Sequence, residues 1–297
     1  MANISLKKDN IVAIIQARCN SIRLPNKIMK KFGGIPAIEL LYNRLKISKE
    51  INNIVIATSK NQCNKKLINL CKKKKINYFL GSENNVLKRY FDASKVFKAD
   101  IIVRITGDSI LIDPRLVDKI IKIFKNNKVD YVSNCEPPTF PDGLDVEVFS
   151  KKCLEKTFKQ VKKNYDKEHV TTYIRSSKKF KTINYKNNID YSNIRWSLDQ
   201  EEDLHEINLI LKHFNTKKYF SWENILKVTE SKKDKFYKNF NIKRNEGAEM
   251  SKTQKLWKRA KQIIPGGNML LSKRPELFLP NKWPAYFSKS KGCNVWD

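Results

Sequence analysis

The spacing of apolar residues between positions 11 and 215 is the feature that most constrains the fold. Short apolar runs alternate there with longer amphipathic stretches. The run at 11–15 is apolar at every position, as in a strand buried on both faces. Val117, Ile121 and Phe124 instead follow the spacing of a helix with one apolar side. Strands separated by helices of about 10–15 residues are typical of parallel βαβ units. The sequence therefore predicts an α/β fold with helices on both faces of a sheet.

The individual elements follow from the same pattern. Strands are expected at residues 11–15, 54–57, 78–80, 101–105, 130–133 and 195–198, and one with a solvent-exposed face around Val146 and Val148. Helices are expected to begin at Pro36, at Asp113 and after residue 203, and to cover residues 62–75, 84–98, 150–163 and 166–178 approximately. Ser82 is a candidate cap for the helix at 84–98. Ligands of such sheets bind beyond the carboxyl ends of the strands, which directs attention to the loops after residues 15 and 105.

The composition argues against several classes of protein. No apolar run approaches the roughly 18 residues of a membrane span, and residues 1–10 hold no apolar signal-peptide core. We therefore expect a cytoplasmic protein without a membrane-spanning segment. The 6 cysteines include no Cys-x-x-Cys pair, and the 3 histidines are not grouped with them. A zinc site or a disulfide framework is not expected.

The net charge of +30 leaves two interpretations open. Most of the 60 basic residues are lysines spread over the chain, and Asn and Ile, which share A/T-rich codons with Lys, are also abundant. We favour a solvated, lysine-rich surface with weak attraction to polyanions and no specific nucleic-acid partner. The alternative is a polyanion-binding protein, which would bind DNA or RNA with a steep salt dependence.

The loop after the first predicted strand carries Arg18, Ser21, Arg23 and Lys27. Cations at the carboxyl end of a strand can neutralise a polyphosphate. Arginine is scarce in this chain, so two arginines in one loop favour a binding role over an ordinary surface loop. The loop matches neither the G-x-x-x-x-G-K-[ST] nor the G-x-G-x-x-G pattern of other nucleotide-binding loops.

The loop after the predicted strand at 101–105 carries Thr106, Gly107 and Asp108. A carboxylate at a strand end beside phosphates is a natural ligand for Mg²⁺, because this ion takes one or two carboxylates together with phosphate oxygens. The alternative role for Asp108 is to cap a turn or a helix.

Three separated motifs resemble those of cytidylyltransferases such as CMP-KDO synthetase, acylneuraminate cytidylyltransferase and, most similar, the spore-coat polysaccharide cytidylyltransferase family. Residues 18–27 are similar to the signature R-x-x-S-x-R-L-P-x-K, with Asn20 in place of the usual Gly. Residues 104–114 are similar to R-I-T-G-D-x-P-L-I-D-P, with Ile110 in place of the first Pro. Residues 195–204 are similar to R-W-T-V-D-T-x-E-D-L. The resemblance covers about residues 10–215.

This resemblance implies a Rossmann-like nucleotidyltransferase fold with a small β-rich insertion for the acceptor and a dimer partner. It implies transfer of CMP from CTP to a sugar, expected to be acidic, with release of pyrophosphate, for surface polysaccharide or glycan biosynthesis. Mg²⁺ is the implied cofactor, with Asp108 and Asp199 as its ligands, and a homodimer is expected.

The resemblance also implies roles for individual residues. The implied catalytic residues are Arg18, Lys27, Asp108 and Asp199. The implied nucleotide-binding residues are Ala17, Arg18, Ser21, Arg23, Lys27, Thr106 and Gly107. The implied acceptor-binding residues are Asp142, Glu147, His169 and Arg195.

The last part of the chain resembles a different family. Residues 256–260, 264–267, 283–286 and 292–297 are similar to the start of glutamate-1-semialdehyde aminomutase-like class III aminotransferases. Those enzymes hold pyridoxal phosphate on a lysine much further along, so we expect neither this cofactor nor aminotransferase activity here. The sequence predicts a nucleotidyltransferase domain at 1–227, a linker at 228–250 and a truncated aminotransferase-like segment at 251–297. A fragment of a bifunctional protein is the second functional alternative.

Overall fold

A computed structural model describes residues 9–21, 23–216, 218–231, 236, 244, 252–264, 289–291 and 294–296. The chain divides into two compact units, Met1–Phe240 and Asn241–Asp297. The first unit contains the predicted α/β domain, and each unit is treated by itself below.

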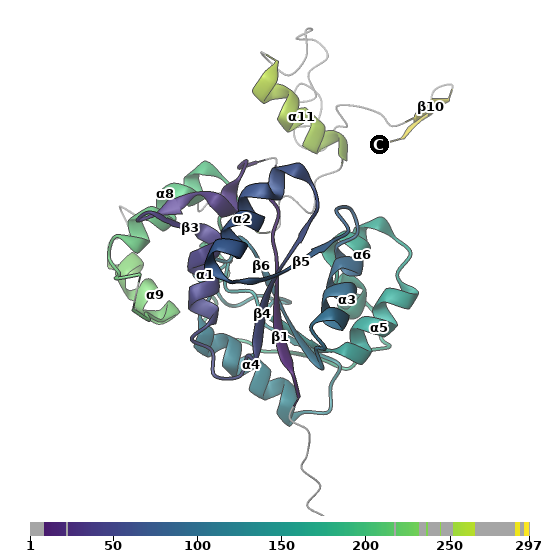
Figure 1. Cartoon of the computed structure of the whole chain (residues 1–297), viewed down its shortest axis with the longest axis horizontal. Coiled ribbons are helices and arrows are strands. Elements are labelled where there is room, and N and C mark those ends of the chain that lie inside the picture. The colour runs from purple at the N-terminus through teal and green to yellow at the C-terminus, as the bar shows by residue number, and fades with distance from the viewer. Residues whose placement is uncertain are drawn as a thin grey trace, which may run out of the picture. The chain divides into compact units, whose positions relative to one another are not determined.

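A seven-stranded sheet forms the centre of the first unit (Figure 1). In spatial order its strands are β5 (Asn77–Gly81), β4 (Asn53–Ser59), β1 (Ile11–Gln16), β6 (Ile101–Thr106), β8 (Glu147–Ser150), β7 (Tyr131–Ser133) and β9 (Thr182–Asn184). The first four strands in this order run parallel, β8 is antiparallel to both of its neighbours, and β9 is parallel to β7. The mostly parallel sheet confirms the predicted α/β class.

Helices cover both faces of this sheet, as Figure 1 shows. One face packs against α1 (Ala37–Leu45), α2 (Lys65–Lys74), α4 (Pro114–Asn126), α8 (Glu201–Leu211) and α9 (Trp222–Glu230). The other face is covered by α3 (Val86–Val96), α5 (Lys151–Gln160), α6 (Asn164–His169) and α7 (Thr172–Ser176). Successive residues of β1 alternate between the two cores, since Ala13 and Ile15 pack in one and Val12 and Ile14 in the other. This alternation explains why the strand is apolar at every position.

The first unit also contains short elements and capped helices. The short elements are the 3-10 turns η1 (Lys27–Met29) and η2 (Gln62–Asn64) and the hairpin of β2 (Lys31–Phe32) and β3 (Ile35–Pro36). Asp113 caps α4 through a bond from the Arg115 N–H at 2.8 Å, with Pro114 in the first turn. Ser150 caps α5 in the same way, through the Cys153 N–H at 3.0 Å.

Two predictions about helix ends were wrong. Ser82 does not cap α3, because Asn85 accepts the Lys88 N–H at 2.8 Å, whereas the Ser82 hydroxyl accepts the N–H of Asn85, the residue before the helix. The helix expected at 166–178 is two helices, α6 and α7. The helix is interrupted at Val170, whose φ of 64° lies outside the right-handed helical region.

The strand predictions around the site were also corrected. Residues 195–198 form no regular strand, because the Trp196 N–H bonds to Asp142 O at 2.7 Å and the Leu198 N–H to Asp108 O at 3.0 Å, both in loops. β8 has no exposed face at Glu147, which is buried with Arg104 and Tyr131 as partners. The sequence pattern did not predict β9 or α9, and α9 runs to Glu230, past the domain limit placed at residue 227.

In the second unit the structure describes helix α11 (Lys252–Ile263) and the antiparallel pair β10 (Lys289–Lys291) and β11 (Asn294–Trp296). The motifs at 265–267 and 283–286 and most of the linker at 228–250 lie outside the described residues. The predicted domain limits therefore stay a prediction. No helix within the described ranges is long and apolar enough to cross a membrane.

Candidate active site

Hydrogen bonds hold the loop between β1 and η1 in place. The Asn26 N–H donates to Cys19 O at 3.0 Å, and the Cys19 N–H donates to the buried side chain of Asn64 at 2.8 Å. Asn26 adopts a left-handed φ of 57°, which Asn tolerates better than most residues. These bonds fix where the loop ends, and Lys27 follows at once as the first residue of η1.

Lys27 joins two carboxylates that come from distant segments. Its Nζ lies 2.7 Å from Asp108 Oδ2 and 2.6 Å from Asp199 Oδ1, and its side chain is only 13% exposed. Asp108 follows β6, whereas Asp199 precedes α8. The loop after β1 therefore meets the loop after β6 at a single ammonium group, as the position of both loops at strand carboxyl ends predicts.

The charges of this cluster stabilise one another. Burial lowers the pKa of Lys27, but Asp108 and Asp199 more than offset this effect, so the pKa is raised. Burial raises the pKa of Asp108, yet the Lys27 ammonium and its hydrogen bond dominate and lower it to about 2. Both groups are thus ionised at neutral pH.

Arg23 is a second cation in contact with Asp199. Its Nη2 lies 2.5 Å from Asp199 Oδ2, so the two oxygens of this carboxylate face two different cations. Arg18 lies apart from this cluster: its half-exposed side chain is 3.7 Å from Glu168. The structure therefore brings together Arg23, Lys27 and both aspartates, and leaves Arg18 at the outer side of the loop.

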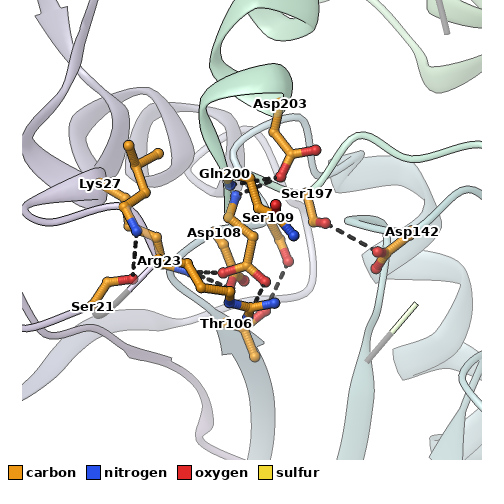
Figure 2. Close-up of polar contacts among 12 residues, drawn as sticks. Ser21, Arg23, Lys27, Thr106, Asp108, Ser109, Asp142, Ser197, Gln200 and Asp203 are labelled. Carbon is orange, nitrogen blue, oxygen red and sulfur yellow. Dashed lines mark hydrogen bonds and ion pairs between the residues drawn. The ribbon is translucent and has the colours of Figure 1, made fainter. Parts of the chain in front are cut away.

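The remaining residues expected to bind nucleotide line the two loops. The Ala17 N–H donates to Ala57 O at 3.1 Å, and the Gly107 N–H donates to Gln16 O at 2.9 Å. A Cβ on Gly107 would lie 2.9 Å from that oxygen and 3.2 Å from the Ala17 Cβ, so only glycine lets the loops approach this closely. The Thr106 hydroxyl is 2.9 Å from that of Ser109. Ser21 accepts the Leu24 N–H at 3.4 Å, and Figure 2 shows it on the opposite side of the cluster from Asp142.

Arg195 lies beside Asp199 but is fully engaged by carboxylates. Its Nε and Nη2 donate to the two oxygens of Asp203 at 2.9 and 3.1 Å, and its Nη1 donates to Asp142 at 2.8 Å. Burial lowers the pKa of Arg195, and Asp203 and Asp142 raise it by more. The expectation that this guanidinium holds an acceptor carboxylate finds no support in the geometry, because its donors already face protein carboxylates.

Sequence reasoning missed Asp203, although a signal was present. The residue is fully buried at the third position of α8, where it also completes a capping box with Gln200 (Figure 2). An acidic residue three positions after a helix cap is typical of this motif. The signal shows a helix start, and only the fold shows that this helix start faces Arg195.

The other two acceptor candidates lie elsewhere in the structure. Glu147 in β8 forms an ion pair with Arg104 of β6 and accepts the Tyr131 hydroxyl at 3.0 Å. Burial raises the pKa of Glu147, but the nearby Arg104 lowers it by more. The net pKa is below its ordinary value, so the carboxyl is ionised at neutral pH. His169 ends α6, with its ring centroid 4.4 Å from that of Tyr165. Asp142 is the candidate that the structure joins to the cluster, through Arg195 and through the Ser197 hydroxyl at 3.0 Å.

The donor set of the site fits a hard cation such as Mg²⁺. Asp108 and Asp199 already converge on one positive group, and two carboxylates with phosphate oxygens are what this ion takes. Within the described ranges no group of three or more His, Cys, Asp or Glu residues could hold a metal by itself. Substrate oxygens and water are the ligands that would complete the coordination of such an ion.

Comparison with known proteins identifies the family. The profile of the cytidylyltransferase family matches residues 12–242, a span that contains every residue of the site. The chain therefore belongs to the cytidylyltransferase family, which confirms the resemblance seen in its motifs. The match ends at residue 242, so the likeness of residues 251–297 to class III aminotransferases gains no support from it and stays a prediction.

Individual relatives agree with this assignment. The chain is 38% identical over 208 residues to an uncharacterised protein of Methanocaldococcus jannaschii, which covers 69% of this chain and 84% of that protein. It is 34% identical over 173 residues to the spore coat polysaccharide biosynthesis protein SpsF of Bacillus subtilis, which covers 57% and 71% of the two chains. The structure of a cytidylyltransferase from Leptospira borgpetersenii superposes with a TM-score of 0.74 at 32% identity, covering 78% of this chain and 98% of that one.

Proposed function

We propose that this chain is a nucleotidyltransferase that transfers CMP from CTP to the hydroxyl group of a sugar and releases pyrophosphate. The observation that carries the proposal is the bonding of one ammonium, Lys27, to Asp108 and Asp199 from two distant segments. Membership of the cytidylyltransferase family supports CTP as the nucleotide. The name of the SpsF relative supports a place in surface polysaccharide biosynthesis.

The loop after β1 is the proposed binding site for the triphosphate. Lys27 and Arg23 offset phosphate charge beside Asp199, and Arg18 extends this positive edge toward solvent. The chemistry needs little more than alignment and charge stabilisation, because phosphoryl transfer passes through a transition state rich in negative charge. The backbone and hydroxyl groups proposed to line the nucleotide are those of Ala17, Ser21, Thr106 and Gly107.

Mg²⁺ is the proposed cofactor, with Asp108 and Asp199 as its protein ligands. When bound, it would supply positive charge that stabilises the α-phosphate and the leaving pyrophosphate. Lys27 keeps Asp108 ionised, because it lowers the pKa of that carboxyl to about 2. The aspartate is therefore ready to bind a cation at any physiological pH.

The proposed acceptor is a sugar, expected to be acidic, on the side of the site where Asp142 stands. Asp142 is the acceptor candidate that contacts the cluster, through Arg195 at 2.8 Å. Glu147 and His169 stay candidates: Glu147 forms an ion pair with Arg104, and the His169 ring lies 4.4 Å from that of Tyr165. A homodimer and a cytoplasmic location stay predictions.

Pyrophosphate release from the purified protein tests the proposal. The assay combines Mg²⁺ and each common ribonucleoside triphosphate with a panel of 3-deoxy-manno-octulosonate, N-acetylneuraminate and amino-sugars. We expect release with CTP and at least one acceptor. In Asp108→Ala it should fall by about 100-fold or more, as when a preorganised charge contact is removed from an active site. Circular dichroism would verify that the variant is folded.

Asp92→Asn is the matched control for this variant. Asp92 pairs with Lys88 at 2.5 Å on the outside of α3, so the control removes another Asp–Lys pair without touching the site. Its rate should equal that of the wild type. A folded Asp108→Ala protein with full activity would overturn the role of Asp108, and a wild type inactive with every nucleotide and acceptor would overturn the proposed function.

A further inference from the structure

We propose that Arg195 and Asp203 are a positioning pair that sets the direction of the Asp199 carboxylate, and that Arg195 does not bind the acceptor. The inference rests on the proposed function, because it assigns these residues to the same site. Four observations carry it: the geometry of the pair, its bonds to the backbone at Asp199, its burial and the charges around it.

The pair has the bidentate geometry of a strong, charge-assisted interaction between side chains. Arg195 donates from Nε to Asp203 Oδ1 at 2.9 Å and from Nη2 to Asp203 Oδ2 at 3.1 Å. Two parallel bonds of this kind fix orientation as well as distance. Asp203 is fully buried and the Arg195 side chain is 5% exposed, so water does not compete for these bonds.

Asp203 also holds the backbone from which Asp199 projects. Its Oδ2 accepts the N–H of Asp199 at 2.8 Å and the N–H of Gln200 at 2.9 Å. One residue earlier, the Leu198 N–H donates to Asp108 O at 3.0 Å. Both peptide units that flank Asp199 are therefore bonded to Asp203. The unit before them is bonded to the loop that carries the other aspartate.

The consequence of this bonding is the direction of the Asp199 side chain. From the fixed backbone its two oxygens reach Lys27 at 2.6 Å and Arg23 at 2.5 Å. A misplacement of about 1 Å at a reacting centre can cost about 100-fold in rate. A residue that touches neither nucleotide nor acceptor can thus control the rate through Asp199.

The charge around Arg195 argues against a second role as an acceptor ligand. Its guanidinium already forms ion pairs with Asp203 and Asp142, and lies 3.6 Å from Asp199. An acceptor carboxylate would have to displace one of these groups and so remove the cationic partner of a buried or largely buried carboxylate, which is strongly unfavourable. The positive charge of Arg195 instead reduces the repulsion between the carboxylates that lie around it.

Steady-state kinetics of Asp203→Asn and Arg195→Lys test the inference. Asn cannot accept the paired bonds of the guanidinium, and Lys keeps the charge of Arg195 without its fork of donors. With CTP and the acceptor that gives the highest wild-type rate, kcat should fall about 10-fold or more in each variant. The KM for the acceptor should change less than about 2-fold. The double variant should be little slower than either single one, because the two residues act as one unit.

Glu136→Gln serves as the control, since Glu136 pairs with Arg175 at 3.1 Å in a largely exposed position. It should leave both kinetic constants unchanged. If Asp203→Asn fails to fold, Arg195→Lys carries the test. A rise in acceptor KM without a fall in kcat would mean that Arg195 binds the acceptor and would overturn the inference, as would wild-type kinetics in both variants. A wild type that turns over no CTP instead refutes the proposed function, and this inference with it.

Discussion

At the scale of single residues, the Arg104–Glu147 pair should contribute strongly to stability. Both side chains are buried, with 11% and 5% of their surface exposed. Removing one partner of a buried pair leaves an uncompensated charge, which costs about 3 kcal/mol or more. Glu147→Gln should therefore lower the free energy of unfolding at neutral pH by about that amount, measured by denaturant titration.

The same variant makes a prediction about pH. Burial raises the pKa of Glu147 and Arg104 lowers it by more, so the folded carboxyl titrates below its ordinary range. A group with a depressed pKa stabilises the fold above its unfolded pKa, and this contribution is lost as pH falls through the folded pKa. The difference between wild type and Glu147→Gln should thus narrow below about pH 4. Glu50→Gln, which breaks a more exposed pair with Lys125, should cost less than about 1 kcal/mol at any pH. A constant difference across this range would contradict the argument.

Individual residues also show what the sequence could reveal about the site. Lys27 and Asp108 were found because each follows a buried strand of the parallel sheet, where carboxyl ends meet. The partners of Arg195 and Glu147 could not be found in this way. Their pairing depends on Asp142, Asp203 and Arg104 lying within bonding distance in the folded chain, and sequence spacing carries no information on that.

At the scale of elements, Asp113 joins two helices on the same face of the sheet. It caps α4 through the Arg115 N–H at 2.8 Å, and it also accepts the Trp222 N–H of α9 at 2.8 Å and the Tyr219 hydroxyl at 3.1 Å. The residue is 1% exposed, so its loss leaves buried donors without partners. Asp113→Ala should destabilise the protein by about 3 kcal/mol, which combines a lost cap with lost buried bonds.

Asn85→Ala is a matched control for Asp113→Ala, because Asn85 caps α3 through one bond, to the Lys88 N–H at 2.8 Å. It should cost about 1 kcal/mol. Equal losses in the two variants, measured by urea denaturation, would show that the bonds from Asp113 to α9 add nothing to stability.

Elements differ in how far the sequence predicted them. Long amphipathic helices and continuous apolar strands near the centre of the sheet were predicted well, since burial alone determines their pattern. The break at Val170 and the irregular course of residues 195–198 were not predicted. The course of residues 195–198 depends on tertiary bonds to the loops that carry Asp108 and Asp142, which local propensity does not contain.

At the scale of the whole molecule, the net charge of +30 coexists with an acidic site. Asp108, Asp142, Asp199 and Asp203 lie close to Arg23, Lys27 and Arg195, so the local charge there is nearly balanced. The excess of lysine elsewhere supplies long-range attraction to a polyanionic nucleotide, and such attraction weakens with ionic strength. The charge of the chain is thus compatible with the proposed function of its site.

The two compact units lead to a prediction about truncation. Among the residues that the structure describes, both apolar cores consist of residues between Ile11 and Phe236, and Phe236 is 4% exposed within the first of them. A chain of residues 1–240 should therefore keep the melting temperature of the first unit and its CTP-dependent rate within about 2-fold. A chain of residues 1–231 removes Phe236 and should lose about 3 kcal/mol of stability, as for the loss of a buried aromatic ring. Neither chain, nor the full one, should show pyridoxal absorbance. An inactive 1–240 chain with an intact fold would mean that residues after Phe240 contribute to the site.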